Sequence, residues 1–237
     1  AAVDKICRFL SFVNRRLGGS QATIARGRRM STARCYLDPA RKRPNLRIET
    51  GAIAEALLFE GKRCIGVRYS LGTALREARA AREVVVSGGT VNSPQLLELS
   101  GIGQPERLKA LGIEVRHSLP GVGENLQDHL QIRAVYTVQN ALTLNTLANS
   151  WWGKAKIGLE YAMSRSGPMS MAPSQLGAFT KSDPSREWAN IQYHVQPLSL
   201  DAFGEPLHTF PAITASVCNL NPSSRGSVTL KSPDFNV

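Results

Sequence analysis

Residues 83–99 read EVVVSGGTVNSPQLLEL, and the predicted fold rests on this stretch. It opens on Glu83–Val86, a mostly apolar run of the kind found in strands buried on both faces, which favours a parallel sheet. The glycine turn Ser87–Gly89 follows it. Beyond the turn, Ser93 is a good N-cap and Pro94 suits the first position of a helix. The stretch therefore predicts a strand, a glycine turn and a helix, the layout of an α/β domain.

The glycine turn at Ser87–Gly89 has the physical features of a phosphate site. Glycines let backbone N–H groups approach an anion closely, and the N-terminus of the following helix adds the positive end of its dipole. Spacing alone is weak evidence, because any α/β protein needs glycines for a tight turn at such a junction. The spacing leaves open both a cofactor site and a purely structural turn.

Antiparallel strands are expected on both sides of this stretch. The upstream strands form a β-meander with turns at Gly61 and Gly72, and they are predicted at 53–59, 63–69 and 75–80. Alternating patterns downstream predict three strands, at 131–138, 191–195 and 212–217. Shorter strands are expected at 46–49, 113–116 and 227–230. Helical spacing covers 151–164. The predicted fold class is α/β, or α+β overall, with part of a Rossmann-like domain carrying an inserted antiparallel meander, followed by an antiparallel sheet backed by helices.

The length and composition are those of a globular protein. With 237 residues, 42% of them hydrophobic, the chain can bury a sizeable core in one large or two smaller domains. No window approaches the roughly 18 consecutive apolar residues of a membrane-spanning helix, and the first twenty residues do not resemble a signal peptide. We therefore expect no membrane span.

The four cysteines, Cys7, Cys35, Cys64 and Cys218, are scattered without a CxxC pair. This spacing argues against a structural zinc site, and we expect no metal. Reduced thiols in a cytoplasmic protein are the expected state. Disulfides in an oxidising compartment are the alternative, although a chain of this length does not need them to hold its core.

The net charge of +11 is concentrated in one segment. Eight basic residues and a single acid, Asp38, lie between Arg26 and Arg47. Prolines interrupt the segment and no regular aromatic residues accompany it, so it is a poor nucleic-acid platform and no nucleic-acid partner is expected. We interpret it as a solvated connection. The alternative is that some of these arginines face an anionic cofactor or another part of a larger protein.

Several longer runs resemble one known family. Residues 87–103, SGGTVNSPQLLELSGIG, are similar to the second signature of the glucose–methanol–choline oxidoreductases, and residues 119–129, LPGVGENLQDH, to another family stretch. Residues 27–46 carry GRRMS, YL and RPNL, and residues 224–228 carry SRGSV, which also resemble family segments. The resemblance covers nearly the whole chain, and the choline dehydrogenase-like bacterial members are the most similar in sequence pattern.

The resemblance implies an FAD enzyme that removes a hydride from the carbon of a small-molecule alcohol. Carried over by position, the residues expected near FAD are Ala54, Ser87, Gly88, Gly89, Asn125, Asp128 and His129. Of these, His129 is interpreted as a loop-fixing residue rather than a base. Gln175 and His194 are the expected substrate-pocket residues, although a structural role for His194 stays open. Gln175 stands in a region where many relatives place a glutamate, which argues against recognition of a choline-type cation.

The resemblance also implies an internal fragment. The chain has no GxGxxG fingerprint, and the family's catalytic histidine would follow residue 237, so none of the histidines is assigned as catalytic. We expect a partial FAD-binding domain at 1–130 and a partial substrate-binding domain at 131–237. On this interpretation the longer parent oxidises the alcohol, and the isolated chain has no turnover. The alternative is a truncated or excised fragment that serves only as a binding or structural module.

Overall fold

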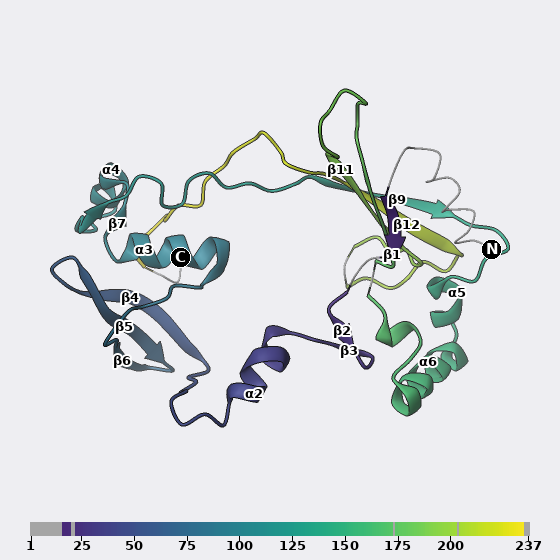
Figure 1. Cartoon of the computed structure of the whole chain (residues 1–237), viewed down its shortest axis with the longest axis horizontal. Helices are drawn as coiled ribbons and strands as arrows, with labels where there is room; N and C mark the ends of the chain where they lie inside the picture. Colours follow the sequence, from purple (N-terminus) through teal and green to yellow (C-terminus); the bar gives the residue numbers. More distant parts are fainter. Residues whose placement is uncertain (1–15, 20–21, 173, 203, 235–237) are drawn as a thin grey trace. The chain divides into compact units, whose positions relative to one another are not determined.

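The computed structural model describes residues 16–19, 22–172, 174–202 and 204–234 (Figure 1). The chain divides into two compact units. Unit 1 takes the described residues up to Leu46 together with His129–Pro222, and unit 2 takes Arg47–Asp128 together with those from Ser223 onward. The chain thus passes between units close to the expected boundary at 130. Its earliest residues group with the later part, and its last residues with the earlier part.

Unit 2 contains the expected β-meander. Strands β4 (Ala52–Glu60), β5 (Arg63–Leu71) and β6 (Ala74–Arg79) pair antiparallel in that order. The pairing of β4 with β5 is irregular at two places, between Ala54 and Ala56 and between Leu58 and Phe59. The three predicted strands are therefore confirmed, with ends that move by one or two residues.

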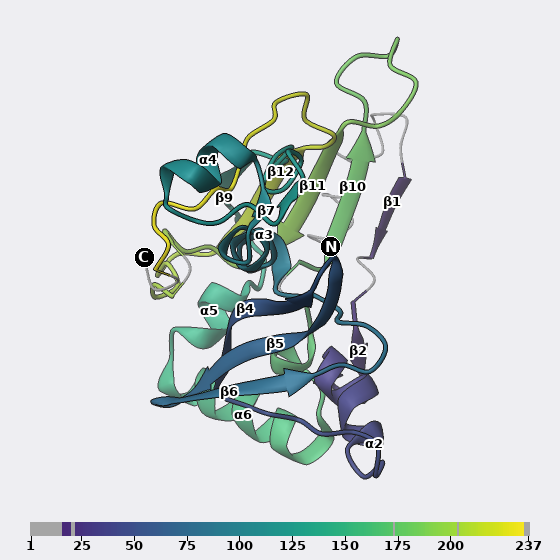
Figure 2. The same cartoon turned by 90° about the vertical axis from the view of Figure 1, so that its left-hand side faces the viewer.

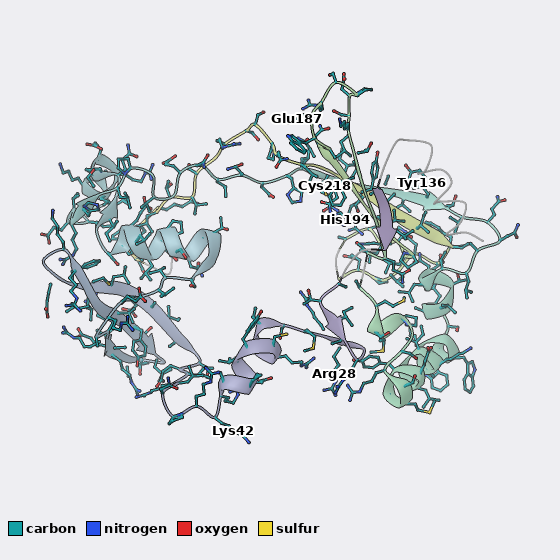
Figure 3. All side chains as sticks on the ribbon, in the orientation of Figure 1. Arg28, Lys42, Tyr136, Glu187, His194 and Cys218 are labelled. Atoms are coloured by element: carbon teal, nitrogen blue, oxygen red, sulfur yellow. The ribbon has the colours of Figure 1, made fainter. Side chains whose placement is uncertain are left out.

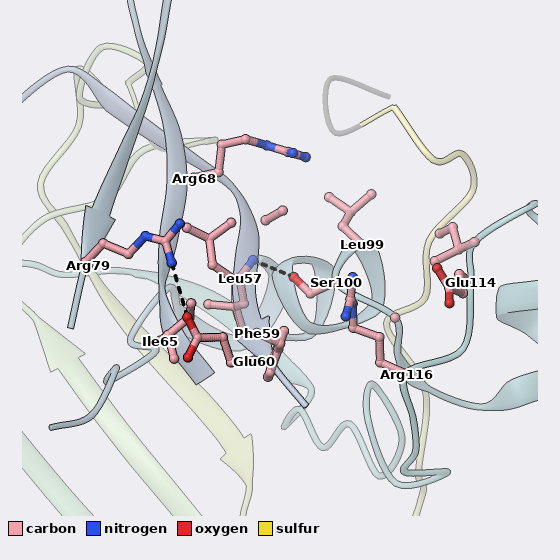
Figure 4. Close-up of a pocket in the computed structure, with 14 residues that line it drawn as sticks. Leu57, Phe59, Glu60, Ile65, Arg68, Arg79, Leu99, Ser100, Glu114 and Arg116 are labelled. Atoms are coloured by element: carbon pink, nitrogen blue, oxygen red, sulfur yellow. Dashed lines mark hydrogen bonds and ion pairs between the residues drawn. The ribbon is translucent and has the colours of Figure 1, made fainter. Parts of the chain in front are cut away.

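Helix α3 (Gly89–Leu99) lies beside β4 in unit 2 (Figure 1). Just after the helix, the Ser100 hydroxyl donates to the carbonyl oxygen of Leu96 at 2.6 Å and accepts from the backbone N–H of Leu57 at 2.8 Å (Figure 4). Ser100 and Leu57 are both buried. One hydroxyl thus joins the end of the helix to the middle of the strand.

The start of α3 corrects the prediction that made Ser93 the N-cap and Pro94 the first residue of the helix. The helix begins at Gly89, and Pro94 lies inside it. Proline has no backbone N–H, so the helix lacks one of its hydrogen bonds at this position. The expected strand at Glu83–Val86 is also wrong. These residues pair with no strand in the described part of the chain, and a strand exists only where a neighbour completes its hydrogen bonds.

Three short predicted strands are likewise absent from the described residues, those at 46–49, 113–116 and 227–230. In place of the second, β7 (Ile102–Gly103) and β8 (His117–Ser118) form a short parallel pair. Near the third, Leu126 and Gly226 form an isolated antiparallel bridge. Short apolar runs predicted strand character, but long-range pairing decides which residues form a ladder.

Unit 1 is built on an antiparallel sheet with the strand order β1-β10-β11-β12-β9, of which β1, β10 and β11 stand side by side in Figure 2. The strands are β1 (Arg16–Gly19), β9 (Gln131–Thr137), β10 (Leu176–Thr180), β11 (Ile191–Gln196) and β12 (Ala212–Asn219). The three strands predicted from alternating patterns are confirmed. The sequence analysis did not predict β1 and β10.

Helices accompany this sheet. Helix α6 (Trp151–Ser164) has the predicted bounds, and the Ser150 hydroxyl caps it by accepting from the backbone N–H of Gly153. Helix α5 (Leu144–Ala148) begins at a capping box formed by Thr143 and Thr146. A short 3-10 turn, η2 (Pro168–Ser170), follows α6. Capping by hydroxyls satisfies N–H groups that would otherwise lack partners.

The basic segment Arg26–Arg47 contains little regular structure. Its elements, with the strand just before it, are β2 (Ile24–Ala25), β3 (Arg28–Arg29), the π-helical turn η1 (Ala33–Leu37) and α2 (Asp38–Ala40). All eight of its basic side chains are exposed. The Tyr161 hydroxyl of α6 donates to the Gly27 carbonyl at 3.0 Å and ties the segment to unit 1. This exposure agrees with the interpretation of a solvated connection.

Within the described residues, no helix has the length and apolar character that a bilayer crossing requires. The same residues hold no group of three histidine, cysteine, aspartate or glutamate side chains placed to bind a metal. Cys35, Cys64 and Cys218 are free thiols, whereas Cys7 lies outside the described residues.

A buried asparagine anchors the loop between β11 and β12. Asn145 of α5 is fully buried, and its Nδ2 donates to Ser199 Oγ at 2.9 Å and to the Phe210 carbonyl at 3.2 Å. Its Oδ1 accepts from the Ser199 backbone N–H at 2.9 Å. Ser199 Oγ also lies 2.9 Å from His208 Nδ1. The loop is therefore fixed to the helix by a buried polar network.

We predict that Asn145→Ala lowers the free energy of unfolding by about 2–3 kcal/mol, because it removes the bonds to Ser199 Oγ and the Phe210 carbonyl and takes the acceptor from the Ser199 N–H. Urea denaturation followed by circular dichroism measures this change. Asn149→Ala is the matched control, since Asn149 is exposed and donates only to the His208 carbonyl at 3.1 Å. The control should lose less than about 1 kcal/mol. Equal losses in the two variants would contradict the anchoring role.

Candidate functional site

The candidate site is a cavity of about 710 Å³ inside unit 2. Its walls come from β4, from Val67 of β5, from the segment before α3 and from α3 as far as Leu99. They include Ala54, Ser87 and Gly88, three of the residues that the family resemblance predicts near a cofactor. More than thirty residues separate Ala54 from the other two in the sequence, so the folding of the meander against α3 brings them together.

The end of the cavity at the glycine turn is formed by backbone. Gly88 is the N-cap of α3, and no side chain caps the N–H groups of the first helical turn. A Cβ on Gly88 would lie 3.1 Å from Asn92 Cβ, and Gly89 has φ +83°. Crowding disfavours a side chain at Gly88, and the left-handed backbone disfavours one at Gly89. The turn therefore presents N–H groups at a helix N-terminus, which is an arrangement that binds anions.

The rest of the wall is largely apolar. Val84–Val86 and Val91 line the cavity, and Val85 and Val91 are 75% and 59% exposed. The polar side chains of Asn92 and Gln95 lie along the same helix. An apolar hollow with backbone donors at one end suits a flat ring that is joined to phosphate groups.

A buried ion pair holds α3 in position. Glu98 of α3 is fully buried, and its Oε1 lies 3.0 Å from Nη1 of Arg107 on helix α4 (Pro105–Ala110). The backbone N–H of Leu230 donates to the other carboxylate oxygen at 2.9 Å. Arg107 Nη2 also bonds to Glu124 Oε1 at 2.7 Å. These partners satisfy a charge whose burial would otherwise be costly.

The pKa of Arg107 is raised above its ordinary value, chiefly by its hydrogen bond to Glu124 and then by Glu98, against the opposing effect of burial. The guanidinium is therefore held in its charged form by two carboxylates. A backbone hydrogen bond also holds the last described residues, since the Val228 N–H donates to the Gly123 carbonyl at 2.7 Å. The segment after residue 223 is thereby held against the LPGVG stretch.

The remaining predicted cofactor residues lie outside the lining of this cavity. Asn125 is exposed and has φ +64°. Asp128 and His129 are also exposed, at the point where the chain leaves unit 2 for unit 1. Gly89 adjoins the cavity through Gly88 without lining it. The structure therefore brings together three of the seven predicted residues, and a role in cofactor binding stays a prediction for all of them.

The two predicted substrate-pocket residues share one face of the unit 1 sheet. His194 is half-buried on β11 opposite Gly177, and the backbone N–H of Gln175 bonds to the Val195 carbonyl at 3.0 Å. Gln175 therefore continues β10 by one position, two residues before Gly177, and lies on the same face as His194. Figure 3 labels His194 and Cys218 on this face, and Tyr136 belongs to the opposite face by register.

The sequence analysis missed other residues in these two places. Val91 and Asn92 line the cavity from within α3, which begins five residues earlier than expected. Arg133 and Ser216 share the face of His194, in one cross-strand row. The alternation of 131–138 and 212–217 already indicated a common face along each strand, but not which strands are neighbours.

Two further hollows carry arginines. One of about 490 Å³ lies on unit 2, where Arg79 Nη1 is 3.8 Å from Glu60 Oε1 and the Arg116 guanidinium lies 5.7 Å from the Phe59 ring centre (Figure 4). The other, of about 410 Å³, lies on unit 1 and is lined by Arg28, Arg29, Arg34, Tyr161, Ala162 and Arg165. Neither contains a predicted site residue.

The chain is similar to known proteins over most of its length. The sequence profile of the GMC oxidoreductases matches residues 13–131. The chain is 43% identical over 209 residues to the oxygen-dependent choline dehydrogenase of Chromohalobacter salexigens, which covers 88% of this chain and 37% of that protein. It is 44% identical over 209 residues to the oxygen-dependent choline dehydrogenase of Burkholderia pseudomallei, again with 88% and 37% covered. The chain thus spans little more than a third of these relatives.

Solved structures show the same fold. An FAD-dependent oxidoreductase from Chaetomium thermophilum superposes with a TM-score of 0.78 at 22% identity, covering 92% of this chain and 44% of that one. A formate oxidase superposes with a TM-score of 0.79 at 23% identity, covering 90% and 41%.

We predict that Arg107→Met destabilises unit 2 by about 3–5 kcal/mol, because it leaves the buried Glu98 carboxylate without its partner. Denaturant unfolding measures the loss, and hydrogen exchange of α3 amides locates it. Lys109→Met on the same helix is the matched control, since Lys109 is exposed. It should change stability by no more than about 0.5 kcal/mol. A loss for Arg107→Met as small as that of the control would contradict the role of the pair.

Proposed function

Because the chain belongs to the GMC oxidoreductase family, we propose that it is part of a longer FAD-dependent enzyme that oxidises an alcohol by hydride transfer to the flavin. The observation that carries this proposal is the cavity of unit 2. It places Ala54 of β4 beside Ser87 and Gly88, at the N-terminus of α3. Ser87 and Gly88 begin the run at residues 87–103 that resembles a family signature, whereas Ala54 lies upstream of it on β4.

The residues of the cavity fit the adenosine and phosphate part of FAD. The backbone N–H groups at Ser87–Gly89 would hold phosphate oxygens, and the helix N-terminus adds favourable electrostatics. The apolar wall at Val84–Val86 would contact the adenine, with the backbone of Ala54 close by. When bound, FAD supplies the acceptor for the hydride that leaves the alcohol carbon. The chain's own contribution is to bind and orient the cofactor.

The two units take different roles in this proposal. Unit 2 belongs to the cofactor-binding domain, and the unit 1 sheet, with Gln175 and His194 on one face, belongs to the substrate domain. Asn125, Asp128 and His129 are also proposed to approach the flavin. The base that takes the hydroxyl proton is assigned to a histidine outside residues 1–237, because alcohol oxidation needs a proton acceptor as well as a hydride acceptor.

We predict that Ser87→Glu in the longer protein weakens FAD binding roughly tenfold or more, because a carboxylate beside the cofactor's phosphates adds like-charge repulsion. Fluorescence titration of the apoprotein with FAD gives the dissociation constant, and flavin absorbance per mole of protein gives the occupancy. Ser87→Ala is the control at the same position, and it should change the affinity by no more than about twofold.

The unmodified longer protein should be yellow, and a primary alcohol should bleach the flavin absorbance under anaerobic conditions. The isolated 237-residue chain should show no turnover. A full-length protein that is colourless and cannot be reconstituted with FAD would contradict the proposed function. An unchanged affinity in Ser87→Glu would instead contradict only the placement of the phosphates.

A further inference from the structure

Three side chains form a row across one face of the unit 1 sheet. Arg133 of β9 is paired with Ser216 of β12, and Ser216 is paired with His194 of β11. Directly opposed side chains in an antiparallel sheet have Cβ atoms about 4.5–5.5 Å apart. The register therefore groups a guanidinium, a hydroxyl and an imidazole on neighbouring strands.

The hydroxyl in this row is buried without a partner. Ser216 is 1% exposed, and its Oγ has no hydrogen-bond partner. Thr214 lies two residues earlier on the same face and is fully buried, but its hydroxyl donates to the Leu198 carbonyl at 2.8 Å. The fold thus satisfies one of two adjacent buried hydroxyls. Buried polar groups normally have partners, so the unsatisfied Ser216 Oγ points to a bound molecule.

Arg133 gives this position its charge. Its guanidinium Nη2 is also buried. An arginine presents five N–H donors in a planar fork, so it can bind a carboxylate through two parallel bonds while it keeps other contacts. With the Ser216 hydroxyl opposite and the half-buried His194 beyond, the row is rich in hydrogen-bond donors and carries a positive charge.

The composition of this face disfavours a cationic ligand. Its positions on β9–β12 contain no aspartate or glutamate and a single aromatic residue, Phe179. They are Gln131, Arg133, Val135, Thr137, Gly177, Phe179, Gln192, His194, Gln196, Ala212, Thr214, Ser216 and Cys218. Proteins recognise quaternary ammonium groups with aromatic cages or carboxylates. The described strands of this face supply neither.

We infer that Arg133 and Ser216 bind an anionic oxygen group of the substrate, a carboxylate foremost, so that the enzyme selects a hydroxy acid over a quaternary ammonium alcohol. The inference rests on the proposed function, because it assigns the substrate class of that enzyme. Arg133 supplies charge and paired donors, and Ser216 supplies one directed hydrogen bond. Both are specificity-determining residues, and neither takes part in hydride transfer.

The test is a binding experiment on the 237-residue chain, which contains the whole row. The probes are 3-hydroxypropanoate, choline and 1-propanol. The binding of each is measured from the NMR shifts of the His194 imidazole C–H groups. 3-Hydroxypropanoate should move these signals and bind at least tenfold more tightly than either other probe. Choline that binds as tightly as the hydroxy acid would overturn the inference.

Two matched pairs of variants separate a ligand role from a structural one. Ser216→Ala should weaken 3-hydroxypropanoate binding about fivefold without lowering the melting temperature, because it removes an unsatisfied hydroxyl. Thr214→Val should lower the melting temperature and leave the affinity unchanged. Arg133→Leu should weaken binding at least tenfold, whereas Arg76→Leu, the same charge change at an exposed position of β6, should not. An unchanged affinity in both Ser216→Ala and Arg133→Leu would overturn the inference.

The same panel applied to the longer protein separates this inference from the proposed function. Flavin content and bleaching by any alcohol test the function. The ratio of kcat/KM for 3-hydroxypropanoate to that for choline tests the inference, and Arg133→Leu should lower that ratio at least tenfold. A flavoprotein that prefers choline would overturn the inference and leave the proposed function standing. A protein without flavin would overturn the function, with the binding result on the chain unaffected.

Discussion

The hydroxyl of Ser100 joins the end of α3 to Leu57, which lies 43 residues earlier in the sequence. It accepts from Leu57 in the middle of β4 and donates to Leu96 near the end of α3. The same strand and helix both line the cavity of unit 2. The glycine turn at the other end of α3 is thereby presented opposite the same strand. This buried hydroxyl thus joins two of the elements that line the candidate cofactor site.

Buried polar groups organise both units in the same manner. Glu98 joins α3 to α4 and to the last described residues, and Asn145 joins α5 to the loop after β11. In each case, all the partners lie within one unit, and burial makes the bonds hard to replace. Ser216 departs from this rule, since its hydroxyl is buried and unsatisfied. The Thr214 hydroxyl, two residues away, does have a partner. This contrast supports the inference that Ser216 binds a ligand.

The two units are interleaved in the sequence. The chain leaves unit 2 after Asp128, builds the sheet of unit 1, and returns at Ser223 to pack against Gly123 and Leu126. Cofactor and substrate roles in the proposed enzyme are therefore not separated by one cut in the sequence. Residues from both parts of a unit are needed to complete it. The sequence-based boundary at 130 marks only one of the crossings.

Local patterns in the sequence determined the meander, helix α6, three strands of the larger sheet and the glycine turn, because turn residues and periodicity act over a few residues. The tertiary structure decided the rest. It left Glu83–Val86 unpaired in the described chain and moved the start of α3 to Gly89. It also set Arg133 beside Ser216, and buried Glu98 against Arg107. Each of these outcomes depends on which distant segment lies alongside. No local pattern encodes that choice, because strand pairing and charge burial are settled between residues far apart in the chain.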